Sequence, residues 1–313
     1  MSTTEPTTAG LVDVARRFYV LGQTQQEIAR AFGVDASTVS RTLKRARATG
    51  VVRIEIRPPH QLRDALSRDL AQRFGLQNAV VVAGRGDPGA VAEEAARFFG
   101  AQLRGGARVG LSWGRMLAAV IQRVVPGAAA NLVISQLLGG VSGEGAGIQG
   151  HELARLLAIA CPESRVHYLH APLLVDSAQI RASMLQDRSI RASLDAAARS
   201  DLALVGIGNL EDSAPLVRYG HLSALDRRRL RKAGAVGDVC ARFFTVEGEP
   251  VRELDDRLLA VDWETLRKTR SVVAVAAGAD KVEATLGALR GGVVSSLVTD
   301  EWTAEEILRG AGS

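Results

Sequence analysis

Residues 24–47 read TQQEIARAFGVDASTVSRTLKRAR, a pattern that predicts two short helices joined by a tight turn. Thr24 and Glu27, three residues apart, can form a capping box at the start of the first helix. Gly33 stands where the turn requires a positive backbone dihedral. Apolar residues recur at helical spacing in both halves, at Ile28, Ala29, Phe32, Ala36, Val39 and Leu43. The stretch is therefore predicted to be a helix-turn-helix.

The outward face of the second helix carries polar and basic side chains. A recognition helix places its first residues against base edges in the major groove of DNA, and Ser37, Thr38 and Arg41 have side chains suited to such contacts. The residues better suited to phosphate contacts are Gln25, Gln26, Ser40, Lys44, Arg45 and Arg47. The candidate DNA-binding residues are Thr24, Gln25, Gln26, Ser37, Thr38, Ser40, Arg41, Lys44 and Arg45. The alternative is a solvated helical hairpin with an incidentally basic rim.

The length of the chain predicts two domains. The 313 residues are 47% hydrophobic, so the larger part can bury a substantial core. We expect a helix-turn-helix domain over residues 1–57, including a first helix at about 11–20 that packs Val14, Phe18 and Leu21 against the motif, and a short strand at 51–56. Pro58-Pro59 marks a linker, and residues 58–313 form the second domain.

Composition narrows the class of protein further. The formal net charge of +5 is mild, and the local excess of cations at 41–47 is more informative. Cys161 and Cys240 lie far apart without metal-binding spacing, so we expect two buried thiols and no disulfide, metal site or cofactor. The apolar runs are short and broken by glycine or charge, which predicts a cytoplasmic protein that makes no contact with a membrane.

After residue 58, apolar runs alternate with amphipathic segments. This alternation predicts a doubly wound, mostly parallel sheet with helices on both faces. The expected strands are 79–82, 108–111, 132–137, 166–169, 202–206, 272–276 and 294–298, and the expected helices include 89–104, 114–124, 149–160, 279–289 and 302–309.

Glycine-rich turns follow several of these strands, where open α/β sheets bind ligands. The turn at 110–115 leaves a strand and opens a helix, so its N–H groups could hold an anion. Asp238 could accept hydrogen bonds from sugar hydroxyls or instead cap a turn or pair with Arg242, and Trp113 could stack on a sugar, although a core position is favoured. The candidate effector-binding residues are Ser112, Trp113, Gly114, Arg115, Gly139, Gly140, Gly206, Gly208, Asp238, Lys281 and Asp300. Glycines that merely allow close packing are the alternative.

An ordered series of motifs resembles the SorC family of bacterial transcriptional regulators over residues 12–308. The motifs are Gln26-Glu27-Ile28-Ala29, Ser37-Thr38-Val39-Ser40-Arg41, Gly110-Leu111-Ser112-Trp113-Gly114, Leu137-Leu138-Gly139-Gly140, His170-Ala171-Pro172, Gly206-Ile207-Gly208, Gly237-Asp238-Val239-Cys240, Arg242-Phe243-Phe244, Ala288-Leu289-Arg290-Gly291-Gly292 and Leu297-Val298-Thr299-Asp300-Glu301.

The resemblance implies a second domain similar to glucosamine-6-phosphate deaminase and ribose-5-phosphate isomerase. It also implies a double-stranded DNA operator, a small phosphorylated sugar as effector, and a homo-dimer or homo-tetramer. Residues 112–115 would match the turn on the phosphate side of the family's ligand site. Lys281 would match the lysine that follows an Ala-Gly-Gly turn in the family. Ala277 and Ala241 replace glycines usual in the family, and either methyl group could narrow the pocket. Some relatives form a lysine Schiff base, but this chain has no lysine between Lys44 and Lys232.

These observations favour a regulator of carbohydrate genes over an enzyme. The alternative is a phosphosugar isomerase or deaminase with an accessory helix-turn-helix domain, which needs a general base close to the substrate. Asp238 and Asp300 are carboxylates in suitable positions, but nothing in the sequence pairs either with an acid partner. We therefore expect no catalytic residues. A scaffold whose helix-turn-helix binds protein has no feature in its favour.

Overall fold

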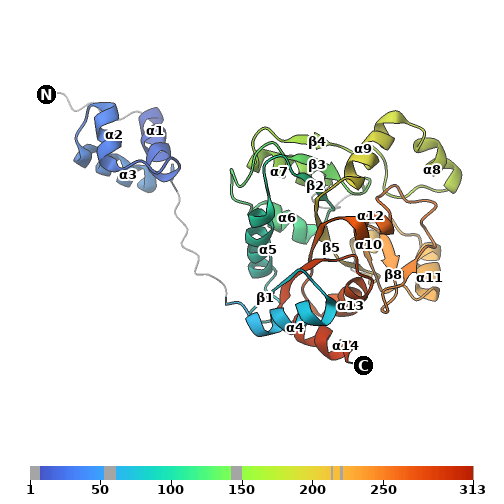
Figure 1. Cartoon of the computed structure of the whole chain (residues 1–313). Helices are drawn as coiled ribbons and strands as arrows, with labels where there is room; N and C mark the ends of the chain where they lie inside the picture. The colour runs from blue at the N-terminus through green and yellow to red at the C-terminus, as the bar shows by residue number, and fades with distance from the viewer. Residues whose placement is uncertain (1–7, 53–60, 142–149, 213, 219–220, 313) are drawn as a thin grey trace. The chain divides into compact units, whose positions relative to one another are not determined.

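The computed structural model describes residues 8–52, 61–141, 150–212, 214–218 and 221–312. The chain divides into two compact units, residues 1–59 and 60–313, and each is described by itself (Figure 1). The first unit is helical and the second is built on a sheet.

The first unit contains α1 (Thr8–Tyr19), α2 (Gln25–Phe32) and α3 (Ala36–Ala48). The predicted capping box is present, because Thr24 accepts from the amide of Glu27 while Glu27 accepts from the amide of Thr24. Gly33 ends α2 at φ 64°, as the turn requires. The core consists of Val14, Ile28, Ala29, Val39 and Leu43, with Phe18 half-buried beside them.

Three residues expected in this core are exposed instead. Leu21 lies beyond the end of α1 and is 57% exposed. Phe32, the last residue of α2, turns outward, and its ring lies 5.2 Å from the guanidinium carbon of Arg17. Ala36 opens α3 on the exposed side. Of the expected strand at 51–56, Val51 and Val52 form a bend, and the remainder lies outside the described residues.

The second unit is centred on a seven-stranded parallel sheet with the order β1-β11-β10-β5-β2-β3-β4. The strands are β1 (Asn78–Val82), β2 (Arg108–Leu111), β3 (Val133–Gln136), β4 (Arg165–His167), β5 (Leu202–Gly206), β10 (Ser271–Val275) and β11 (Ser296–Asp300). Each matches a strand expected from the sequence. The chain runs β2-β3-β4 toward one edge and β5-β10-β11 toward the other, so the strand order reverses between β2 and β5.

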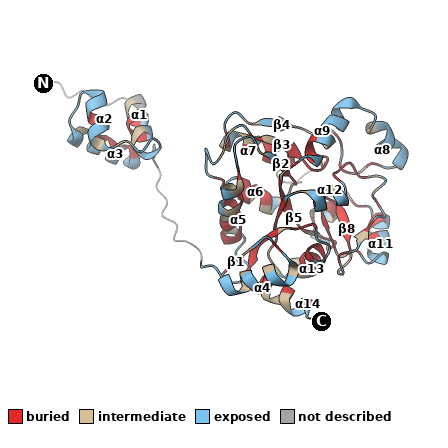
Figure 2. Ribbon diagram, viewed as in Figure 1, coloured by how far each residue is buried: buried red, intermediate tan, exposed pale blue. Residues whose placement is uncertain are grey.

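Helices cover both faces of this sheet, as a doubly wound fold requires. On one face α5 (Pro88–Gln102), α6 (Arg115–Ile121) and α7 (Gly150–Ala160) pack around Val109, Leu204 and Val273. On the other face α4 (Asp64–Phe74), α13 (Val282–Arg290) and α14 (Glu301–Ala311) pack around Val81, Ala203 and Ala274. Figure 2 shows the central strands of the sheet buried, whereas β4 at its edge is largely exposed.

A second, smaller sheet was not predicted from the sequence. It is antiparallel, with the order β6-β7-β8-β9, and comprises β6 (Gly208–Asn209), β7 (Gly237–Val239), β8 (Arg242–Phe244) and β9 (Pro250–Val251). Asp238 therefore lies in a strand. The remaining helices are α8 (Ala178–Met184), α9 (Arg188–Ala198), α10 (Pro215–Arg218), α11 (Ala224–Lys232), α12 (Trp263–Lys268) and the 3-10 turn η1 (Ala279–Lys281).

Candidate functional site

A cavity of about 620 Å³ opens at the carboxyl ends of β2, β5 and β10. This is where the strand order reverses, the usual ligand site of an open α/β sheet. Eight of the eleven predicted effector residues line it: Ser112, Trp113, Gly114, Arg115, Gly206, Gly208, Asp238 and Lys281. Further wall residues not selected from the sequence include Asn209, Asp280, Met116 and Arg123.

Three predicted effector residues lie outside the wall that the described residues form. Gly139 and Gly140 donate backbone hydrogen bonds to Leu259 and Ala171, and a Cβ at Gly139 would approach the carbonyl oxygen of Pro172 to 2.5 Å. Gly139 therefore permits close packing of chain segments. Asp300 is buried and caps α14 by accepting from the amide of Thr303 at 2.9 Å.

Two of the three cations in the cavity wall, Arg115 and Lys281, lie close enough for their charges to interact. Arg115 opens α6 and is exposed, whereas Lys281 ends η1 and is half-buried. The pKa of Lys281 is lowered, first by burial and also by the nearby charge of Arg115, against the opposing influence of Asp280 and Asp238. Within the described residues neither cation has a carboxylate in ion-pair contact. The site therefore holds two neighbouring positive charges that an anion would stabilise.

Asp238 provides a carboxyl group in the cavity wall. It is only 8% exposed, and its Oδ2 accepts a hydrogen bond of 2.9 Å from the amide of Ala241. Burial raises its pKa from 3.8 to about 6, although the Ala241 hydrogen bond and the charge of Lys281 oppose this shift. Gly208 is required opposite, since a Cβ there would lie 2.0 Å from Oδ1 of Asp238.

Asp238 does not pair with Arg242, one of the roles left open by the sequence. Arg242 donates to Asp255 at 2.8 Å and to the carbonyls of Val261 and Ala260 at 2.8 and 2.9 Å. The guanidinium therefore fixes the chain behind β8, and the Asp238 carboxylate keeps acceptor capacity for a ligand. Cys240, also in the wall, stays a thiol because burial raises its pKa to about 12.

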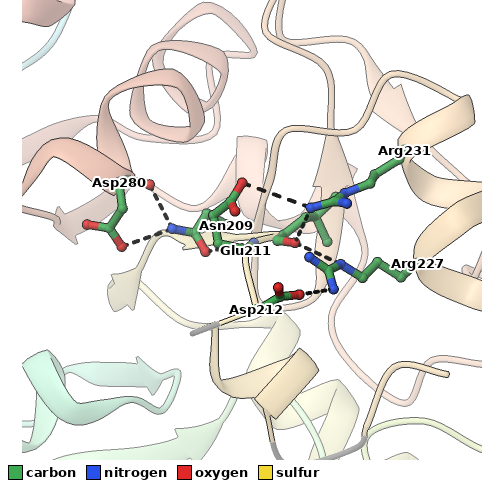
Figure 3. A network of polar contacts seen from close by, with 7 residues as sticks. Asn209, Glu211, Asp212, Arg227, Arg231 and Asp280 are labelled. Carbon is green, nitrogen blue, oxygen red and sulfur yellow. Dashed lines mark hydrogen bonds and ion pairs between the residues drawn. The ribbon is translucent and has the colours of Figure 1, made fainter. Parts of the chain in front are cut away.

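A polar network holds the cavity wall between Asn209 and Asp280 (Figure 3). The amide of Asn209 donates to the backbone oxygen of Asp280 at 2.7 Å and to its carboxylate at 3.0 Å. On the other side of this segment, Arg227 and Arg231 from α11 both donate to the carbonyl of Leu210. The wall beside Lys281 is thus fixed from two directions before any ligand arrives.

Trp113 has an intermediate position. Its ring is half-buried, packs against the apolar cores on both faces of the sheet and also lines the cavity. The same side chain can therefore fill the core and stack on a sugar, the two roles considered for Trp113 from the sequence.

In the described ranges no group of three His, Cys, Asp or Glu side chains is placed to hold a metal ion, and no helix is long and apolar enough to cross a bilayer.

The helix-turn-helix presents its candidate DNA contacts at the surface. Thr24, Gln26, Ser37, Ser40, Arg41, Lys44 and Arg45 are exposed, and Gln25 and Thr38 are half-buried. Arg41 donates to Thr38 Oγ1 at 3.1 Å, so these two side chains are held together on the face of α3. Asp35, which sequence reasoning passed over, is the N-cap of α3 and accepts from Thr38 and Ser37.

Comparisons with known proteins bear on both units. Residues 60–309 match the family model described as "Putative sugar-binding domain", and residues 14–64 match a MarR family model. The deoxyribonucleoside regulator of Bacillus subtilis strain 168 is 30% identical over 304 residues, which cover 95% of this chain and 96% of that protein. The sorbitol operon regulator of Klebsiella pneumoniae is 30% identical over 309 residues, covering 96% of this chain and 97% of that one.

A solved structure agrees with these matches. The crystal structure of the full-length sorbitol operon regulator SorC from Klebsiella pneumoniae aligns with a TM-score of 0.71 at 28% identity, covering 95% of this chain and 98% of that chain. The chain belongs to the SorC-type family of sugar-binding transcriptional regulators. It is a transcriptional regulator with a sugar-binding effector domain, and its relatives are regulators rather than enzymes.

Proposed function

We propose that the protein binds a DNA operator through α3 and that a phosphorylated sugar in the cavity controls this binding, thereby regulating genes of carbohydrate metabolism. The domains are residues 1–57 for DNA binding and 58–313 for effector binding and oligomerisation. The observation that supports the effector class best is the pair Arg115 and Lys281, two neighbouring cations without a carboxylate in ion-pair contact among the described residues.

A phosphate group matches this pair chemically. Its charge offsets the repulsion between the two cations, and charge-assisted hydrogen bonds from Arg and Lys are about twice as strong as neutral ones. Asp238, on the same wall, can accept from sugar hydroxyls, while the apolar side chains of Leu117 and Ile207 cover the carbon skeleton. A volume of about 620 Å³ lies within the range of small-molecule sites.

The exposed face of α3 supports the DNA-binding half of the proposal. Ser37, Thr38 and Arg41 occupy its first two turns and suit base contacts, and Lys44 and Arg45 follow with charges suited to phosphates. A homo-dimer or homo-tetramer would place two such helices on a palindromic operator, with half-sites about one helical turn apart. The relatives named for sorbitol and deoxyribonucleosides support a carbohydrate effector.

The proposal is tested in two steps with the full-length protein. Selection from a random duplex library identifies an operator, and fluorescence anisotropy then measures its affinity with and without ribose 5-phosphate, 2-deoxyribose 5-phosphate, glucose 6-phosphate, fructose 6-phosphate and the unphosphorylated sugars. We expect one phosphorylated sugar to change operator affinity, within the roughly 5- to 150-fold range typical of allosteric coupling. Equal responses to a sugar and its phosphate would contradict the assignment of the effector class, and failure to select any duplex would contradict the function.

A further inference from the structure

One continuous set of contacts joins the cavity to the place where the chain enters the second unit. Residues 61–63, the linker root, are the first described residues after residue 52. The linker root lies antiparallel to the end of β1, where Leu62 bridges Val82, the amide of Arg63 donates to Val81 at 2.8 Å, and the amide of Ala83 donates to Gln61 at 2.7 Å. This pairing fixes the direction in which the backbone leaves the sheet.

A single carboxylate ties the linker root to the start of α14. Glu301 Oε1 accepts from Arg63 Nε at 2.6 Å, and its Oε2 accepts from the amide of Gly84 at 2.8 Å. Arg63 is the residue before α4, and Gly84 follows β1, so the Glu301 side chain contacts the guanidinium of the first and the backbone amide of the second. The two hydrogen bonds from Arg63 and Gly84 also lower the pKa of Glu301, and the carboxylate remains charged over the physiological range.

Asp300, the residue before Glu301, contacts the turn that begins at Gly278 and leads to Lys281, here called the cavity turn. Asp300 Oδ2 accepts from the amide of Gly278 at 3.2 Å, and Thr303 Oγ1 accepts from the same amide at 2.9 Å. Thr303 in turn donates to Asp300 at 2.8 Å. Gly278 begins the turn that leads through η1 to Lys281, with a φ of 109° that favours glycine. Asp300, Glu301 and Thr303, here called the α14 cap, therefore touch the cavity turn on one side and the linker root on the other.

We propose that the α14 cap is the mechanical link by which occupation of the cavity changes the exit direction of the linker, with Glu301 and Arg63 as its positioning residues. This inference rests on the proposed function, because it explains how that function is executed. A ligand that draws Lys281 inward displaces the turn at Gly278. Asp300 and Thr303 follow through their shared hydrogen bonds, and Glu301, adjacent in the chain, carries Arg63 and Gly84 with it.

The Arg63–Glu301 ion pair is partly exposed, so its role can be tested by mutation and compared with a control pair. Surface ion pairs contribute little to folding stability, so removal of the Arg63–Glu301 contact leaves the fold intact. The pair Arg108–Asp201 provides a matched control. It has a contact of 2.9 Å and similar side-chain exposure, but it joins the starts of the central strands β2 and β5, at the opposite end of the strands from Glu301. If the loss of any surface ion pair altered the coupling, breaking either pair would have the same effect. If the coupling passes through the α14 cap, only breaking Arg63–Glu301 will reduce it.

The first experiment needs no ligand. Hydrogen exchange, followed by mass spectrometry on the full-length protein, measures the amides of Arg63 and Ala83 in the wild type, in Thr303→Val and in the control Asp201→Asn. Thr303→Val removes one of the two acceptors of the Gly278 amide without touching Glu301. We expect faster exchange at Arg63 and Ala83 in Thr303→Val only. Unchanged exchange at both amides, while exchange at Gly278 increases, would overturn the inference.

The second experiment measures coupling directly, using the four sugar phosphates named above as probes. Glu301→Gln and Arg63→Gln should bind the operator and each sugar phosphate with wild-type affinity when each is measured alone. The ratio of operator affinities with and without sugar phosphate should fall to within about twofold of unity. Arg63→Lys, which keeps the positive charge, should restore part of the ratio, and Asp201→Asn should retain all of it.

The two proposals fail in different ways. A wild-type protein that responds to none of the four sugar phosphates contradicts the proposed effector class, and the exchange measurement still decides the α14 cap. A wild-type response that persists undiminished in Glu301→Gln contradicts the α14 cap and leaves the proposed function standing. Loss of operator binding in Glu301→Gln without any sugar phosphate would also overturn the inference, because it would make Glu301 a structural residue.

Discussion

The amide of Ala241 donates to Oδ2 of Asp238 at 2.9 Å, and Ala241 has a left-handed backbone with φ 59°. Cys240 before it is also left-handed, at φ 53°. Two consecutive non-glycine residues in this conformation make the turn between β7 and β8 a strained element of the cavity wall. The hydrogen bond that orients the Asp238 carboxylate thus comes from a turn of unfavourable backbone geometry.

Replacement of Ala241 by glycine should relieve this strain. A left-handed residue with a Cβ costs roughly 1–2 kcal/mol, and the greater unfolded-state freedom of glycine offsets about 0.5–1 kcal/mol of it. We expect Ala241→Gly to raise the free energy of unfolding by up to about 1 kcal/mol, measured by urea denaturation. The control is Ala277→Gly, which has no positive φ and should be neutral or destabilising. A destabilised Ala241→Gly would show that the methyl group is needed for packing.

The main sheet was predictable because its central strands, such as β5, β10 and β11, are buried on both faces. Parallel strands covered by helices appear in the sequence as short continuous apolar runs, and the edge strand β4, which is largely exposed, was found from the apolar residues at its end. The smaller sheet was missed because its strands are only two or three residues long and include Gly208, Asp238 and Pro250, which are depleted in strands generally. Tertiary contacts, such as the packing of β7 against α13, stabilise this sheet where local propensity does not.

The cavity residues that lie at the carboxyl ends of strands were predictable from the sequence. Ser112 and Lys281 follow β2 and β10, and Gly206 ends β5; the carboxyl ends of these three strands meet, so the topology brings the three residues together. Gly139 and Asp300 also follow strands, but one packs against Pro172 and the other caps α14. A glycine or an aspartate after a strand gives the same sequence signal in either case. Only the three-dimensional contacts separate a ligand residue from a packing residue.

The contribution of Asp238 to folding stability should decrease as pH rises. Its pKa is 3.8 when unperturbed and about 6 in the folded protein, because burial disfavours the charged form. Between these values the folded state binds a proton that the unfolded chain does not, so the contribution of Asp238 to stability decreases as pH rises through this window. Asp238→Asn should therefore raise the melting temperature above pH 6, and this gain should disappear below pH 3.8.

A carboxylate of opposite character provides the control for that measurement. The pKa of Asp201 is lowered, chiefly by the hydrogen bond from Arg108, so its stabilisation is present at neutral pH and is lost as pH falls through the folded pKa. Asp201→Asn should lower the melting temperature at neutral pH, and the difference should shrink in acid. If Asp238→Asn instead behaves like Asp201→Asn, the carboxylate at 238 is stabilised by a partner and the burial argument is wrong.

Lys281 should determine effector affinity without affecting the operator complex. Its half-buried ammonium faces the cavity beside Arg115, and a hydrogen bond to a charged group is worth about 1.5–3 kcal/mol. Lys281→Ala should weaken sugar-phosphate binding by roughly 10- to 100-fold, measured by isothermal titration calorimetry. Operator affinity without sugar phosphate should be unchanged. Lys232→Ala, at the exposed end of α11, is the matched loss of charge and should change neither quantity.

Arg41 should determine which sequence the protein prefers, whereas Lys44 should determine how tightly it binds any duplex. Both side chains are exposed on α3, but Arg41 lies nearer the start of the helix, which enters the major groove. Arg41→Ala should cost about 1–3 kcal/mol on the selected operator and relax preference at one base position. Lys44→Ala should weaken specific and non-specific binding alike and reduce the salt slope by about one unit. Anisotropy titrations at several salt concentrations, on the operator and on a scrambled duplex, distinguish the two. An Arg41→Ala protein that loses affinity equally on both duplexes would place Arg41 on the phosphate backbone.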